Sequence, residues 1–195
     1  MSPANKNCDH PPMKPPFILG YAESHVKMSK YRAIFLSEEI TRSTASELSA
    51  LLLYMDNQEQ EVPIQIYINS PGGDASALVQ ILDIMDMVKS PVHTIVIGKA
   101  YSAGAILLAA GDERYALPSS KMMLHGVQYG FPLPGNDIID NKNYYGFVNQ
   151  SNETIMKLMA KYTGQPLEKL KQDLSRELWL TASDAVAYGL VDGII

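Results

Sequence analysis

The stretch that decides the fold is residues 93–111, HTIVIGKAYSAGAILLAAG. Its first part is rich in Ile and Val, which is typical of a strand, and its second part, Ala103 to Ala110, has the small residues and leucines of a helix. A single hydroxyl, Ser102, lies between the two, flanked by small residues and one tyrosine. A serine at such a turn is either a small capping residue or a nucleophile exposed on a sharp bend.

A second strand, turn and helix precede this stretch. The segment VPIQIYIN alternates apolar and polar residues and predicts a strand that ends at Asn69. The turn SPGGD follows, and residues 75–88 carry apolar side chains at helical spacing, with Asp74 placed to cap the helix. Strand, turn, helix, strand, turn, helix is the order of βαβ units, so we expect an α/β domain with a parallel sheet.

The rest of the chain completes this pattern. Short apolar or alternating runs predict three further strands, and periodic apolar stripes predict four further helices. The strands are expected at 33–36, 113–118 and 121–124, and the helices at 41–56, about 140–161, 167–173 and 182–188.

Size and composition restrict the function. A chain of 195 residues, of which 46% are hydrophobic, can bury one core and form one domain. A net charge of -5 without a basic stripe argues against nucleic acid as a partner. Cys8 is the only cysteine, and no residues have metal-ligand spacing, so we assign neither a disulfide nor a metal. No secretory signal or apolar stretch of roughly 18 residues is present, and we expect a soluble, cytoplasmic protein without a membrane contact.

The start of the chain has a different composition. Five prolines lie between Pro3 and Pro16, and proline removes backbone donors and favours extended chain. We therefore expect residues 1–29 to form a flexible N-terminal arm and residues 30–195 to form the domain.

Two residues carry candidate chemistry. The pattern Ala100-x-Ser102-x-Gly104 is close to the G-x-S-x-G elbow, in which small neighbours allow the bend. The amide of Ala103 would lie beside the reacting carbon, and the PGG turn could supply a second donor for an oxyanion. His125 directly follows a predicted strand, where it could act as general base or be an ordinary surface imidazole.

Five blocks in unbroken order carry a family resemblance: YINSPGGD, GKAYSAGAILLAAG, LPSSKMMLH, KYTGQPLEKL and ASDAVAYGLVDGI. Together they resemble the proteolytic subunit of the Clp protease, a serine peptidase, over about residues 30–195. The resemblance implies an α/β fold of the ClpP/crotonase-like type, a spiral of ββα units with a protruding handle helix.

The resemblance also implies site residues. Ser102 matches the nucleophile of the family and His125 its general base, while Gly73 and Ala103 match the two oxyanion-hole residues. The third triad position, an aspartate in the family, is occupied here by Glu177, and Asp173 matches a different position. Glu can fill this role because the residue need only orient and stabilise the imidazolium.

The implied function is hydrolysis of unfolded proteins and peptides by a serine endopeptidase inside two stacked heptameric rings. An AAA+ Clp ATPase would feed the chamber and use the ATP, so this subunit needs no cofactor. One alternative is a weakly active or regulatory ring subunit, with catalysis weakened at Glu177, that assembles with a more active ClpP paralogue. Another is an acyl-CoA enzyme of the crotonase fold, which we rank last because such enzymes typically use acidic residues rather than an elbow serine.

Overall fold

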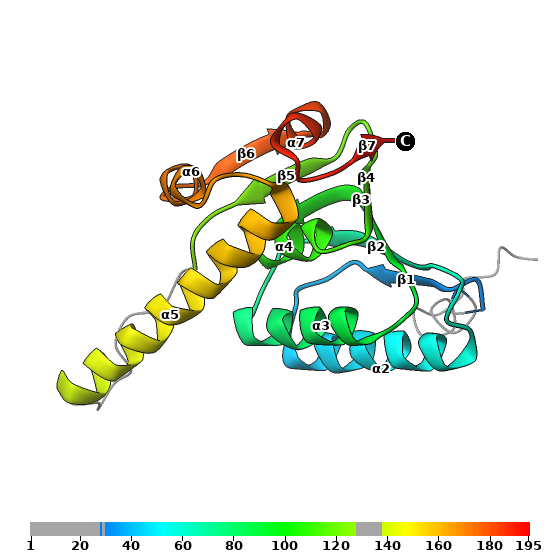
Figure 1. Cartoon of the computed structure of the whole chain (residues 1–195), viewed down its shortest axis with the longest axis horizontal. Helices are drawn as coiled ribbons and strands as arrows, with labels where there is room; N and C mark the ends of the chain where they lie inside the picture. Colours follow the sequence, from blue (N-terminus) through cyan, green and yellow to red (C-terminus); the bar gives the residue numbers. More distant parts are fainter. Residues whose placement is uncertain (1–27, 29, 128–137) are drawn as a thin grey trace, which may run out of the picture.

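The computed structural model describes residues 28, 30–127 and 138–195. The predicted arm, residues 1–29, therefore lies almost entirely outside the described residues and stays a prediction. Figure 1 shows the described chain as a mixed α/β domain from which one long helix, α5, extends. The strands are β1 (Ala33–Leu36), β2 (Ile64–Ser70), β3 (Val92–Tyr101), β4 (Glu113–Ala116), β5 (Lys121–Leu124), β6 (Leu178–Thr181) and β7 (Gly193–Ile194). The helices are α2 (Arg42–Gln58), α3 (Ala75–Met87), α4 (Ala103–Ala109), α5 (Ile138–Thr163), α6 (Leu167–Asp173) and α7 (Ala182–Tyr188).

The strands form one sheet whose main path is parallel. Its order is β1-β2-β3-β4-β7, and β5 pairs with the end of β3 and, in antiparallel fashion, with β6. Helices α2 and α3 pack side by side beneath the sheet, as Figure 1 shows. The predicted α/β fold of the ClpP/crotonase-like type is thereby confirmed, including the handle helix, which is α5.

The hydrophobic pattern explains the position of β2. Ile64, Ile66 and Ile68 are fully buried, whereas the residues between them are only half-buried. This alternation places one row of side chains in the core and directs the chain end at Ser70 toward the glycine turn.

The second half of β3 differs from the expectation. The sequence indicated that the strand ends at Gly98, but it continues to Tyr101. Residues 93–96 pair with β4, and residues 99–101 pair with β5 instead. Gly98 has φ of +98°, which allows the chain to bend between these two partners. The strand therefore delivers its last residue, Tyr101, directly to the turn that holds Ser102.

Helix boundaries follow the expected signals closely. The Asp74 side chain accepts a hydrogen bond of 2.7 Å from the Ala77 amide, as the predicted cap requires. Helix α5 runs without interruption through Gly146. Among the described residues, no helix is both long and apolar enough to cross a membrane.

Candidate active site

Ser102 occupies a strained bend between β3 and α4. Its φ and ψ are 52° and -122°, a combination that residues with a side chain rarely adopt. Two sets of main-chain bonds hold it there: the Ser102 amide donates to the Met123 carbonyl at 2.7 Å, and the Ser102 carbonyl accepts from Ala105 at 2.9 Å. In the described structure its hydroxyl makes no capping bond to α4. The Ser102 side chain thus does not cap the helix, and the geometry of the residue matches the nucleophile elbow.

The glycine turn after β2 packs directly against this bend. A Cβ on Gly72 would lie 2.8 Å from the Cβ of Ser102, and φ at Gly72 is +96°. The fully buried Ser70 hydroxyl braces the turn, because it accepts a bond of 3.1 Å from the Gly72 amide and donates one of 2.6 Å to the Glu38 carbonyl. Only glycine at position 72 allows the two turns to approach this closely.

Two main-chain amides, those of Gly73 and Ala103, are the candidate oxyanion donors. Ile40 donates to the Gly72 carbonyl and accepts from the Asp74 amide, both at 2.8 Å. In such a parallel bridge the N–H of the middle residue, Gly73, points away from Ile40. Ala103 begins α4, so its amide has no acceptor within the helix. Gly73 and Ala103 both line the cleft that contains Ser102.

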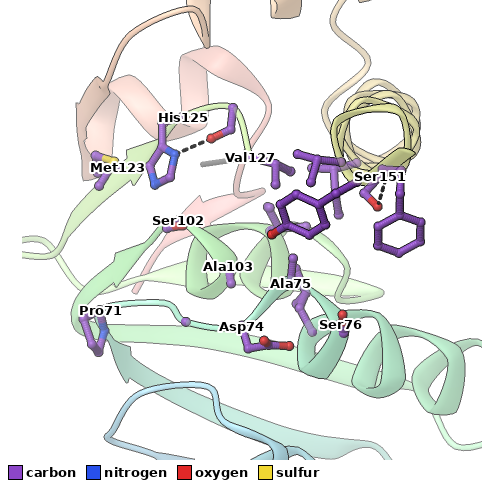
Figure 2. A pocket seen from close by; sticks show the side chains of 18 residues that line it. Pro71, Asp74, Ala75, Ser76, Ser102, Ala103, Met123, His125, Val127 and Ser151 are labelled. Carbon is purple, nitrogen blue, oxygen red and sulfur yellow. Dashed lines mark hydrogen bonds between the residues drawn. The ribbon is translucent and has the colours of Figure 1, made fainter. Parts of the chain in front are cut away.

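His125 lies on the same side of the cleft as Ser102 and the two amides. It follows the last residue of β5 and lines the same cleft as Ser102, a space of about 440 Å³. Figure 2 shows its ring beside Met123, on the same rim of the cleft as Ser102. The Nδ1 atom lies 2.5 Å from the Gly126 carbonyl oxygen. Because a carbonyl can only accept, a hydrogen bond here requires the hydrogen on Nδ1, and in the neutral imidazole of that tautomer Nε2 has the lone pair that a general base needs.

The opposite wall of the cleft comes from α5. Its contribution is mostly apolar, with two hydroxyls, those of Tyr144 and Ser151, and it faces the elbow across the space seen in Figure 2. The α5 residues that line the cleft are Tyr144, Phe147, Val148, Ser151 and Ile155. A cleft with polar groups at one end and apolar side chains at the other suits a peptide segment with an apolar side chain.

Glu177 lies on the far side of His125, just before β6. It is exposed, and its Oε2 accepts a hydrogen bond of 3.1 Å from the indole Nε1 of Trp179. Glu177 and His125 both line a second cleft of about 470 Å³. Among the hydrogen bonds of the described residues, none joins the Glu177 carboxylate to the imidazole. The fold thus places His125 on one cleft with Ser102 and on the other with Glu177, and no hydrogen bond of the described residues joins any two of the three side chains.

Asp173 is bound to other groups. Its carboxylate accepts hydrogen bonds from Lys169 and from the Tyr188 hydroxyl, the latter at 2.8 Å. The bond from Lys169 is the largest of the causes that lower the pKa of Asp173. Asp173 lines neither of the two clefts around His125. Its partners give it a structural role at the end of α6.

Sequence reasoning missed three contributors to this site. The buried Ser70 hydroxyl, the Gly126 carbonyl and the Trp179 indole each bind a group that forms the turn or the candidate triad. Only Ser70 had a signal, because a serine directly before a PGG turn can bind the backbone two residues on. Within the described ranges, no three His, Cys, Asp or Glu residues gather to hold a metal.

A serine on a strained strand-to-helix bend, with a histidine and two main-chain amides on the same cleft, is the arrangement of a serine hydrolase. The comparison with protein families gives the particular group. The family model described as Clp protease matches residues 21–195. The chain therefore belongs to the Clp protease family and is a serine peptidase of that type.

Proposed function

We propose that this chain is the proteolytic subunit of an ATP-dependent protease, an endopeptidase that cleaves unfolded proteins and peptides at Ser102. The observation that carries the proposal is the strained backbone of Ser102, whose hydroxyl makes no capping bond to α4. Ser102 shares one cleft with His125, Gly73 and Ala103. Strain of this kind persists only where the surroundings impose it, and it concentrates at functional sites.

The acylation step follows from the tautomer of His125. Nε2 takes the proton of the Ser102 hydroxyl as Oγ attacks the scissile carbonyl carbon. The carbonyl oxygen becomes an oxyanion, which the Gly73 and Ala103 amides stabilise by hydrogen bonds. When the peptide C–N bond breaks, Nε2 returns the proton to the leaving amine, and an ester to Ser102 remains.

Deacylation reverses these roles. Water loses its proton to Nε2 as its oxygen attacks the ester carbon, and the same two amides stabilise the second oxyanion. Ser102 then leaves with the proton from His125, and the free enzyme is restored. The Gly126 carbonyl orients Nδ1–H in the resting enzyme. Glu177, as third triad member, accepts that N–H in place of Gly126 and stabilises the imidazolium when its carboxylate reaches the ring.

The proposal includes the assembly. Members of the family generally form rings that work with Clp ATPases, and we propose two stacked heptameric rings, with this subunit fed by an AAA+ unfoldase. A closed chamber suits a cleft whose specificity rests on a mostly apolar wall, because such a wall discriminates weakly between substrates.

One observation favours a second candidate function. The carboxylate expected to support His125 is bound to Trp179 instead. A subunit with this arrangement would turn over slowly alone and would serve as the weakly active or regulatory member of a ring that contains a more active paralogue.

The experiment is a parallel measurement on the purified full chain and its Ser102→Ala variant. Native mass spectrometry reports assembly, and a small fluorogenic peptide, which needs no ATPase, reports hydrolysis. Ring-sized particles with hydrolysis that disappears in Ser102→Ala support the first candidate. Rings without hydrolysis until a paralogue is added support the second. Hydrolysis that survives in Ser102→Ala contradicts the proposed nucleophile.

A further inference from the structure

The environment of Glu177 is unusual because its hydrogen-bond donor is held in place. Trp179 stacks edge-on against Tyr101, with ring centroids 5.1 Å apart and an interplanar angle of 73°. Tyr101 is the last residue of β3, and Trp179 is opposite Met123 in the β5–β6 ladder. The indole is therefore fixed by the strand pair and the ring contact, although 55% of Trp179 is exposed.

A fixed indole N–H is a directed donor. It holds one oxygen of the Glu177 carboxylate at 3.1 Å. His125 lines the same cleft as Glu177, but its Nδ1–H is given to the Gly126 carbonyl. Glu177 and His125, the expected pair, thus each have a different partner. To move to the imidazole, the Glu177 carboxylate must give up its bond to the Trp179 indole.

We infer that Trp179 is a positioning residue that sets where Glu177 rests, and that its N–H competes with His125 for the carboxylate. This inference rests on the proposed function, since it gives Glu177 the third role of the triad. In the resting enzyme Glu177 is bound to Trp179. As His125 becomes an imidazolium, the new positive charge draws the carboxylate to the ring, at the cost of the Trp179 bond.

The competition predicts that removing only the donor raises turnover. Trp179→Phe keeps an aromatic ring against Tyr101 and deletes the N–H that holds Glu177. We expect kcat on a small peptide to rise about three- to tenfold, the range for loss of one partly exposed hydrogen bond to a charged group. KM should stay within about twofold, because neither side chain lines the substrate cleft beside α5.

A double-mutant cycle tests whether Trp179 acts through Glu177. In the Glu177→Ala background, Trp179→Phe should have no effect on kcat, because no carboxylate remains to be released. An equal rise in both backgrounds would overturn the inference, and so would an unchanged or lower kcat in Trp179→Phe alone.

A second readout does not depend on catalysis. Trp179 is the only tryptophan in the chain, so fluorescence excited at the red edge of the indole absorption, where the 11 tyrosines absorb little, reports this residue. Glu177→Ala should change the emission intensity or maximum, whereas Asp173→Asn, whose carboxylate binds Lys169 and Tyr188, should leave it unchanged. Identical emission from wild type and Glu177→Ala would show that the indole does not hold this carboxylate and would contradict the inference.

The two levels of the proposal can fail separately. Labelling of Ser102 by a fluorophosphonate tests the nucleophile, and absent labelling in both wild type and Trp179→Phe would refute the proposed function together with the inference. Labelling of Ser102 in both proteins, combined with unchanged turnover in Trp179→Phe and unchanged fluorescence in Glu177→Ala, would refute the role of Trp179 only.

Discussion

The two sides of His125 are built in different ways. On one side, the backbone holds the candidate nucleophile: Ser102 is fixed by bonds at its amide and its carbonyl, and Ala103 behind it is buried. On the other side, Glu177 is an exposed side chain whose position depends on one bond to Trp179. The first geometry is a property of the fold, and the second is a property of one rotamer.

This difference shows that the fold fixes the position of the candidate nucleophile but not the position of the third triad residue. A bend enforced by β3, α4 and a buried serine hydroxyl cannot relax without disturbing the core. A carboxylate on the surface can change its partner at little cost. We therefore expect changes on the Ser102 side to be severe and changes on the Glu177 side to be graded.

The largest effect should come from the nucleophile and its base. Ser102→Ala should lower turnover by about 10⁶, and His125→Ala should cost nearly as much, because the two act as one unit. Hydrolysis of a small fluorogenic peptide measures both, with native mass as the control for assembly. The double variant should be no worse than either single one. Losses that multiply would show that His125 does not serve Ser102.

A substitution at Gly73 tests its amide as an oxyanion donor on the Ser102 side of His125. A Cβ at this position would lie 2.2 Å from the Ile40 carbonyl oxygen, so Gly73→Ala must displace the turn and its amide. We expect turnover to fall by about 10² to 10³, the cost of one oxyanion donor.

Gly146→Ala is the matched control for Gly73→Ala. Gly146 lies in α5, and apart from its chain neighbours and the backbone of its own helix no described atom lies within 4 Å of the position its Cβ would take. The control should keep full activity and gain up to about 1 kcal/mol in unfolding free energy from the better helix propensity of alanine. Equal activity in the two variants would remove Gly73 from the site.

Glu177 should show the graded effect. Loss of a buried triad aspartate's charge costs about 10⁴, but here Gly126 already orients His125. We expect Glu177→Gln to lower kcat only about ten- to a hundredfold, the value of one charge-assisted bond. Asp173→Asn should leave kcat unchanged. The same peptide assay measures kcat for both variants. If Asp173→Asn were inactive and Glu177→Gln had normal kcat, our assignment of the third triad residue would be reversed.

The smallest effect concerns stability away from the cleft. Arg114 donates to the Asp192 carboxylate at 3.0 Å and to the carbonyls of Tyr162 and Gly189. The bond from Arg114 is the largest cause that lowers the pKa of Asp192 below its ordinary 3.8. Asp192→Asn should lower the free energy of unfolding by about 1 kcal/mol, limited by the exposure of the pair, and should not change kcat.

The pH dependence of this effect has a definite sign. Because the pKa of Asp192 is lower in the folded state, its stabilisation is complete above 3.8 and is lost as the pH falls further. Denaturant unfolding of wild type and Asp192→Asn should differ at pH 6 and converge as the pH falls below 3.8. A constant difference across this range would contradict the role given to the ion pair.

Much of the fold could be predicted from local signals. Both strand–turn–helix units, the Asp74 cap and the position of His125 after a strand followed from periodicity and turn residues. Strands β6 and β7 were missed. β7 has only two residues, too few for a periodic pattern, whereas β6 has the same four-residue length as the predicted β1 and β5. Their existence depends on pairing with β5 and β4, which are distant in sequence.

The site could be predicted only in part, for a related reason. The elbow pattern is local, so Ser102 and Ala103 could be identified from neighbouring residues. The brace at Ser70 depends on Glu38, 32 positions away, and no local pattern encodes that contact. The partner of Glu177 is a choice between rotamers, and a sequence position cannot specify a rotamer.

Site-directed labelling tests the assignment of Ser102 most directly. The full chain and its His125→Ala variant are treated with a fluorophosphonate, and the modified residue is located by peptide mapping with mass spectrometry. We predict a single adduct on Ser102 in the wild type and a labelling rate strongly reduced in His125→Ala, because the base activates the hydroxyl. No adduct on the assembled wild type, or an adduct on another serine, would contradict the assignment.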